Sequence, residues 1–199
     1  ERIEKVKLMR LNSKKEATRK DAERAFQFAE CRYKDADCII IPRHSSENRD
    51  YIPMGFLSKG TVVADSAFAV YDAPMWLFGI LTSKIHMAWV KIVGGRLKTD
   101  YRYSAQLCYN TFPFPKISEE KKKQIESAAE EVLLCREDYP DKTLADLYDP
   151  DKMPDNLRQA HHALDLIIES CYQDKPFESD EERLECLFKL YEKMTKKEK

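Results

Sequence analysis

"PMWLFGILTSKIHMAWVKIV", residues 74–93, is the stretch that decides the fold, because its side chains are apolar over nearly its whole length. A run of this length has to be tested against a membrane span. Lys84 and His86 lie at its centre, after a threonine and a serine, and lipid would penalise these polar groups by several kcal/mol. We therefore expect one helix buried against a sheet, with Pro74 in its first turn and two glycines at its end.

Short extended segments precede this helix and predict a small sheet. In "ADCIIIPRHSSENRDYIPMGF", residues 36–56, a β-branched run stops at Pro42, a polar loop follows, and a second extended run leads to Gly55. Two more strand-like pieces lie at residues 61–63 and 67–71, so we expect a mixed sheet of three to five strands. The helix positions expected to pack as core against this sheet are Trp76, Ile80 and residues 87–90, which include Trp89.

Helical periodicity replaces this pattern after the alternating Phe and Pro of "FPFP". Apolar residues recur at helical spacing after Ser118 and again after Pro154, with a short helix or turn over residues 144–154 between them. Ser179 and Glu182 have the spacing of a capping box that begins a last helix. These segments predict a helical subdomain without strands.

The patterns together predict an α+β chain. A small mixed β-sheet domain with a buried helix is expected over residues 1–115, followed by an all-α subdomain over residues 116–199. Residues 13–28 are expected to form a helix capped by Ser13. The first residues are charged and do not begin with methionine, which favours an excised fragment without a secretory signal.

The net charge of -1 conceals two halves of opposite sign. Residues 1–115 carry 19 Lys or Arg against 13 Asp or Glu, a net of +6, whereas residues 116–199 carry 15 against 22, a net of -7. A locally positive surface attracts polyanions whatever the total charge, and an acidic half is more often a solvated helical surface. The first half is therefore the part expected to meet a phosphate-bearing partner.

The cysteine and histidine positions argue against disulfide and metal sites. The chain has 6 cysteines but no CxxC pair, which favours reduced thiols in a cytosolic protein. Zinc needs four converging ligands, and the neighbours His161 and His162 cannot both face one ion from a helix. We expect no metal site.

Catalytic motifs are also missing from the sequence. "GGRLKTD", residues 94–100, follows a helix and matches neither phosphate-binding glycine pattern. "NTFPFP" is similar to the Asn-Pro-Pro-aromatic motif of adenine methyltransferases, but two residues separate Asn110 from the first proline, so Asn110 is not assigned to catalysis. Ser45 and Ser46 lie beside His44 without the elbow that presents a nucleophilic serine. No catalytic residue is proposed.

The segment that begins at the two glycines is the best candidate for binding nucleic acid. Five cations stand against one acid within 19 residues, and Arg or Lys on a tight loop can grip guanine in the major groove or hold phosphate. The cations are Lys84, Lys91, Arg96, Lys98 and Arg102, and the acid is Asp100. Tyr101 and Tyr103 either stack on a ligand or pack within the protein. The alternative is a solvated hairpin edge with protective charges.

A second candidate is the polar loop "HSSENRD" with the arginine before it. Arg43, Ser45, Ser46 and Arg49 combine charged forks with small hydroxyls, which suits contact with phosphates. The alternative is ordinary turn chemistry, in which Ser and Asn side chains bond to the backbone of their own loop.

Four blocks occur here in an order that resembles the C-terminal part of one protein family. They are "IPRHSSENRDYIPMGF", "LFGILTSKIHMAWVKIVGGRLKTDYRYS", "CYNTFPFP" and "LADLYDPDKMPDNLRQAHHALD". The chain resembles, over roughly residues 10–175, the MmeI-like family of single-chain type II restriction-modification enzymes and their methyltransferase-only relatives. In that family a nuclease region, which is absent from some members, a helical connector and an adenine-N6 methyltransferase domain precede a target recognition domain and a helical tail.

The resemblance implies that residues 1–115 are much or all of a target recognition domain, whose strands and loops enter the major groove where the methyltransferase flips out an adenine. Base-reading positions of the family lie largely in the region corresponding to Lys84–Arg102, so Arg96 and Lys98 are expected to touch base edges. The other DNA-binding residues implied are Lys84, Tyr101 and Arg102, with Arg43, Ser45, Ser46 and Arg49 as phosphate or second-loop contacts.

The resemblance also implies what lies outside this sequence. The methyl-donor loop, an Asn-Pro-Pro-Tyr motif and a nuclease motif do not occur in it. The fragment is therefore expected to bind double-stranded DNA without chemistry or a cofactor of its own, and S-adenosylmethionine would belong to the missing methyltransferase domain of the same parent chain. We expect a bacterial, cytoplasmic protein without a membrane partner. The rival interpretations are a protein-docking module without direct DNA readout and a complete small enzyme.

Overall fold

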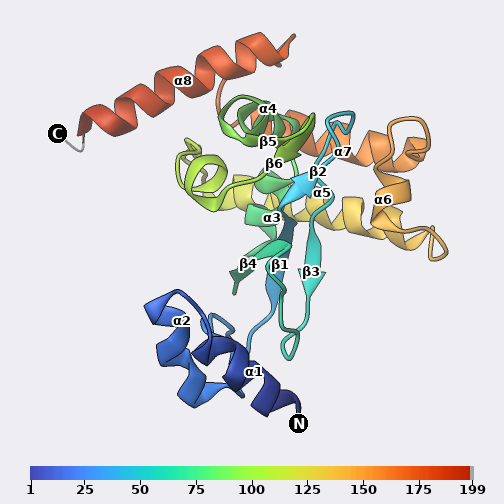
Figure 1. The fold of residues 1–199 in the computed structure, drawn as a ribbon. Helices are drawn as coiled ribbons and strands as arrows, with labels where there is room; N and C mark the ends of the chain where they lie inside the picture. Colours follow the sequence, from blue (N-terminus) through green and yellow to red (C-terminus); the bar gives the residue numbers. More distant parts are fainter. Residues whose placement is uncertain (198–199) are drawn as a thin grey trace. The chain divides into compact units, whose positions relative to one another are not determined.

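The computed structural model describes residues 1–197 and divides the chain into two compact units. The first unit spans Glu1–Lys34 and the second begins at Asp35 (Figure 1). The second unit holds both the sheets and the long helices, so the packing itself does not mark the boundary expected at residue 115, which stays a prediction.

The first unit is helical but differs from the expected helix over residues 13–28. Its elements are α1 (Arg2–Leu11), α2 (Glu16–Lys20) and a 3-10 helix (Asp21–Arg24). Lys15 is the N-cap of α2, and the Ser13 hydroxyl instead accepts a 3.2 Å bond from the Lys15 N–H. The helix α1 was missed because what holds it is not local: the Arg10 guanidinium donates to the carbonyls of Asp21, Arg24 and Gln27 at 2.7–3.0 Å.

The first sheet has the order β3-β1-β4 and antiparallel pairing throughout. Its strands are β1 (Cys38–Pro42), β3 (Gly55–Leu57) and β4 (Ala67–Tyr71). The strand predicted at residues 67–71 is confirmed, whereas residues 61–63 form no strand. The expected mixed sheet is wrong in this detail, because both neighbours of β1 run antiparallel to it. In the described chain, no helix lies between β1 and β4 to return the chain for a parallel pairing.

A second sheet, of order β2-β6-β5, was not expected as a separate unit. Its strands are β2 (His44–Ser45), β5 (Gly95–Leu97) and β6 (Asp100–Arg102). The hairpin β5–β6 turns at Lys98, which has a φ of 57°. Positive φ is uncommon for a lysine. Lys98 adopts it because the pairing of β5 with β6 leaves only a tight turn between the two strands.

The apolar stretch forms two helices instead of one. They are α3 (Met75–Leu81) and α4 (Lys84–Val93). The break lies at Ser83, whose hydroxyl accepts the His86 N–H at 3.4 Å and donates to the Ile80 carbonyl at 2.6 Å. Ser83 thus caps α4 and ends the continuity with α3. Within residues 1–197, none of the helices has the length and apolar character needed to cross a membrane.

The helix α4 is the centre of the core, as its sequence predicts. Met87 and Trp89 of α4 are all but completely buried, as is Ile80 of the neighbouring α3. The second tryptophan differs, because Trp76 is only partly buried and has the Lys122 ammonium 5.5 Å above its ring. The helix α3 packs so closely on α5 that a Cβ at Gly79 would lie 2.6 Å from a methyl carbon of Ile125.

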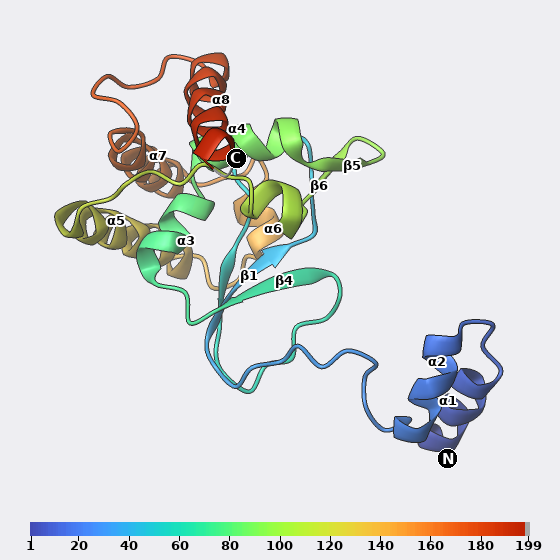
Figure 2. The ribbon, with the colours of Figure 1, turned by 90° about the vertical axis from the view of Figure 1, so that its left-hand side faces the viewer.

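The last part of the chain is helical, as expected. After a π-helical turn (Ala105–Tyr109) come four helices, α5 (Glu119–Glu137), α6 (Leu144–Leu147), α7 (Asp155–Glu169) and α8 (Asp180–Lys197). The predicted starts are confirmed: Ser118 and Pro154 are the N-caps of α5 and α7, and the Ser179 hydroxyl accepts the Glu182 N–H. In Figure 2, α5 lies beside α7, and α8 lies against α4.

Candidate nucleic-acid interface

The β5–β6 hairpin continues directly from α4 and carries the strongest candidate residues. The Arg96 guanidinium lies 4.0 Å from the centre of the Tyr101 ring, which is a cation–π distance. It also donates to the carbonyl of Thr99 at 3.1 Å and to that of Lys91 at 3.2 Å. Arg96 therefore holds the hairpin together, and its exposed outer side remains available to a ligand.

The register of the small sheet separates two of the candidate arginines. Tyr101 pairs with Arg96 on one side and with Ser45 on the other, while Arg102 pairs with His44. Paired residues share a face of a sheet, and successive residues alternate. Arg96 and Arg102 therefore point to opposite faces, which the sequence pattern could not reveal.

Lys98 and Arg102 are the cations of this hairpin that the structure leaves unpaired. Both side chains are exposed, and within residues 1–197 neither makes a hydrogen bond or an ion pair. An unpaired surface cation gains most from an incoming phosphate, because it has no carboxylate to give up. These two side chains are free to meet DNA without rearrangement.

Most of the candidate side chains of the second loop are buried or make contacts within the protein. Arg43 forms a 2.7 Å ion pair with Asp65 and lies over the Phe68 ring at 4.7 Å. Ser45 is 4% exposed, and its hydroxyl has no hydrogen-bond partner within the described chain. Ser46 accepts the Asn48 N–H at 3.4 Å, which is the turn chemistry of the alternative interpretation.

Arg49 is the remaining member of that loop. It is half-buried, and the part of the chain that the structure describes offers its guanidinium no hydrogen bond or ion pair. Of the four residues predicted there, Arg49 is the one whose charge is available for a phosphate.

The two lysines of α4 both contact the acidic helices α7 and α8, but in different ways. The Lys91 ammonium forms a 2.8 Å ion pair with Asp180 at the start of α8. Lys84 is half-buried at the amino end of α4, where its backbone N–H donates to Asp165 of α7 at 2.7 Å. The charge of Lys91 is therefore paired with an acid of α8, whereas the bond of Lys84 to α7 is made by its backbone N–H and not by its ammonium group.

Asp165 is a buried carboxyl that joins three parts of the second unit. It is 4% exposed, accepts the Lys84 N–H through one oxygen and accepts the Tyr51 hydroxyl at 2.7 Å through the other. Burial raises the pKa of this carboxyl to about 7, against the opposing effect of the two hydrogen bonds. The sequence pattern gave no signal for it, since an aspartate within an amphipathic helix normally faces water.

The raised pKa of Asp165 predicts a pH dependence of stability. Its folded pKa of about 7 lies above its unfolded value near 3.8, so between these values only the folded state holds the proton, and stability falls as pH rises. The loss is at most about 4 kcal/mol. His86, whose pKa burial lowers to about 3, acts in the opposite sense. The free energy of unfolding should therefore be compared between wild type and Asp165→Asn.

Denaturant titrations from pH 4 to pH 8 make this comparison. The wild type is expected to lose stability relative to Asp165→Asn up to about pH 7 and no further above it. The titration of His86 affects the stability of both proteins equally, so its contribution cancels in the comparison. Parallel pH curves for the two proteins would contradict the raised pKa.

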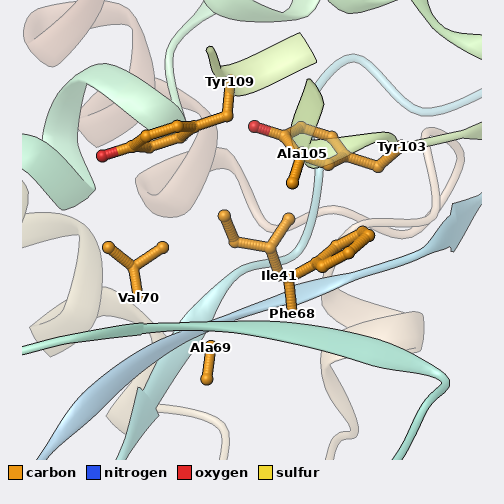
Figure 3. Close-up of a pocket in the computed structure, with 7 residues that line it drawn as sticks. All are labelled: Ile41, Phe68, Ala69, Val70, Tyr103, Ala105 and Tyr109. Carbon is orange, nitrogen blue, oxygen red and sulfur yellow. The ribbon is translucent and has the colours of Figure 1, made fainter. Parts of the chain in front are cut away.

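One apolar hollow of about 210 Å³ lies between the first sheet and the π-helical turn. Figure 3 shows Ile41, Phe68 and Val70 on one side of it and Tyr103 and Tyr109 on the other, with Ala69 pointing away. The Tyr103 hydroxyl is already bonded to His86 at 3.0 Å. This lining suits one apolar side chain and offers no cation for a phosphate.

The structure also places the cysteines and possible metal ligands. All six cysteines are unpaired. Among residues 1–197, no three His, Cys, Asp or Glu side chains lie together in a way that could hold a metal ion.

Comparison with known proteins gives matches over the whole described chain. A family model described as "MmeI, target recognition domain" matches residues 1–116, and one described as "MmeI, C-terminal domain" matches residues 117–198. DNA methyltransferase A of Bacillus subtilis (strain 168) is 49% identical over 197 residues, which are 99% of this chain and 22% of that protein.

A solved structure is also similar. The type IIL restriction-modification enzyme MmeI, determined in complex with DNA, superposes with a TM-score of 0.94 at 41% identity, over 98% of this chain and 26% of that one. The chain thus spans about a quarter of the length of both relatives.

Proposed function

This chain belongs to the MmeI family of restriction-modification enzymes, and from this we propose that it selects the DNA site at which a longer parent enzyme acts. The observation that carries the proposal is the match of residues 1–116 to a target recognition domain. The relative MmeI has been solved bound to DNA, which makes duplex DNA the partner of first choice.

The geometry of the second sheet supports this role. A narrow hairpin that presents Lys98 at its tip and Arg102 on one face has the size and charge to enter a DNA groove. Arg96, held over Tyr101, keeps its fork in a fixed orientation, which favours reading a base edge over a loose phosphate contact. Arg49 is the cation of the neighbouring loop that suits a phosphate.

The chemistry belongs to the parent enzyme in this proposal. The parent is an S-adenosylmethionine-dependent methyltransferase that modifies adenine at N6, in the bacterial cytoplasm, and this chain contributes no catalytic residue. The methyl donor binds to the methyltransferase domain of the parent, which is also the intramolecular partner of this chain. The DNA methyltransferase among the relatives supports the part of this assignment that makes the parent a DNA methyltransferase.

Binding of this chain to duplex DNA tests the proposal. The affinity is expected to fall steeply as salt rises, with a slope of log K against log salt of about -0.9 for each phosphate contact. Arg102→Ala should reduce that slope by about 1, because it removes an unpaired cation. Fluorescence anisotropy with a labelled duplex at several salt concentrations measures both effects.

Lys189 of α8 provides the matched control, since it is exposed but already paired with Glu185 at 2.6 Å. Lys189→Ala should leave the slope unchanged. If the chain binds no duplex DNA but does bind a separately produced methyltransferase domain, the rival docking function replaces the proposed one.

A further inference from the structure

The helix α4 leads almost directly into the β5–β6 hairpin. One residue, Gly94, separates the end of α4 at Val93 from the start of β5 at Gly95. This joint is tight, because a Cβ at Gly94 would lie 2.5 Å from the carbonyl oxygen of Val90. No flexible linker separates α4 from the hairpin. We therefore expect a rotation of α4 to move the hairpin with it.

The amino end of α4 is held by a side chain from the helical part of the chain. Ser83 caps the His86 N–H locally. The N–H of Lys84, the first residue of the helix, has no acceptor within the helix and donates to Asp165 of α7. The N–H groups of the first turn have no partner within a helix, and a carboxyl oxygen is a favoured acceptor for them. Asp165 thus completes the capping of α4 from 81 residues away.

The other carboxyl oxygen of Asp165 is occupied as well. It accepts the hydroxyl of Tyr51, whose ring stacks on His161 of α7 at 4.1 Å. The carboxyl is thereby fixed on both sides, between the loop after β2 and the start of α4. A side chain held at two points sets the position of α4 more closely than a single contact does.

The remaining charges around Asp165 are satisfied by one another. Glu169 lies one turn further along α7 and is 3% exposed, but it pairs with Arg183 of α8 at 2.7 Å and not with α4. Arg183 also lies 3.3 Å from Asp180, which pairs with Lys91. The two buried acids of α7 thus have different targets, since Asp165 holds α4 and Glu169 holds α8.

We propose that Asp165 is a positioning residue for DNA site recognition: it fixes the amino end of α4 and, through it, the orientation of the β5–β6 hairpin. The proposal rests on the function proposed above and deepens it. It makes the helical region that matches the C-terminal domain part of the recognition apparatus, although its residues need not touch a base. Asp165 itself is buried and has no access to DNA.

The test uses the full-length parent enzyme and its preference for one duplex over another. A random-sequence duplex library identifies the site that the wild type methylates fastest, and the ratio of kcat/KM between this site and its single-base variants is then measured. The ratio does not depend on the fraction of enzyme that is folded, so a loss of stability alone leaves it unchanged. Asp165→Ala is expected to lower this ratio about tenfold.

Three further variants make the result specific. Asp165→Asn should keep the ratio near its wild-type value, because an amide oxygen caps a helix almost as well as a carboxylate. Glu169→Gln is the matched control: it is equally buried, on the same helix, and should leave the ratio at its wild-type value. If Asp165→Ala does not accumulate, Asp165→Glu keeps the carboxyl group but displaces it by one methylene, and the same loss is expected.

The outcomes distinguish this proposal from the one on which it rests. If the wild type shows no sequence preference, the proposed function fails. If the wild type is selective, and Asp165→Ala or Asp165→Glu methylates with the wild-type ratio, the positioning role of Asp165 is refuted and the function stands. An equal loss of ratio in Glu169→Gln would also refute it, since the effect would then belong to the packing of α7 in general.

Discussion

Replacement of Trp89 by alanine is expected to lower the free energy of unfolding by about 3–5 kcal/mol. Trp89 is 1% exposed, and its ring lies 5.2 Å from that of Phe188 and 5.7 Å from that of Tyr191. The substitution leaves a cavity beside α8 and removes the contacts of the indole ring with Phe188 and Tyr191 of that helix. Denaturant titration of the chain, followed by circular dichroism, measures the loss.

The second tryptophan provides the control for this prediction. Trp76 is only partly buried, beside the Lys122 ammonium, so Trp76→Ala removes less buried area and should cost clearly less. An equal loss of unfolding free energy in the two variants would contradict the explanation from their different burial.

Arg96→Ala in the full-length enzyme is expected to weaken its preference at one base pair by about 1–3 kcal/mol, or about 5- to 150-fold in kcat/KM ratio. The guanidinium is exposed, yet its orientation is set by Tyr101 and by two backbone carbonyls. A fork fixed in this way is suited to discriminate between base edges, so its removal is expected to leave the base unread. Methylation rates on duplexes that differ at one position measure the change.

Two substitutions separate reading from mere charge. Arg96→Lys keeps the charge but loses the fork, so it should behave like the alanine variant in preference while losing less affinity. Arg102→Ala lies on the opposite face and should weaken all sequences alike. If the enzyme with Arg96→Ala methylates the same sites at the same rate, the assignment of Arg96 to base reading is wrong.

Local chemistry explains why part of the fold could be predicted from the sequence. Ser118 and Pro154 begin helices because their side chains suit the first turn of a helix, and this depends on few neighbours. The β-branched run at Cys38–Pro42 forms a strand for a similar reason. The family, too, was correctly inferred from four short blocks and confirmed by the matches over residues 1–198.

The candidate site was harder to predict, because its properties depend on partners far along the chain. Nothing near Lys91 indicates that Asp180, 89 residues away, neutralises it. The break at Ser83 was also missed, since an apolar run continues on both sides of it and only the capping bonds reveal that two helices meet there.

The sequence by itself determined the kinds of elements, the family, and the set of cations from which an interface can be built, because these follow from residue type and spacing. Only the tertiary structure decided which of those cations remain available and where they point. The register of the small sheet sends Arg96 and Arg102 to opposite faces, and Asp165 fixes the helix from which their hairpin extends. The reason is physical: strand register and long-range hydrogen bonds arise from packing between distant segments, and no local pattern encodes them.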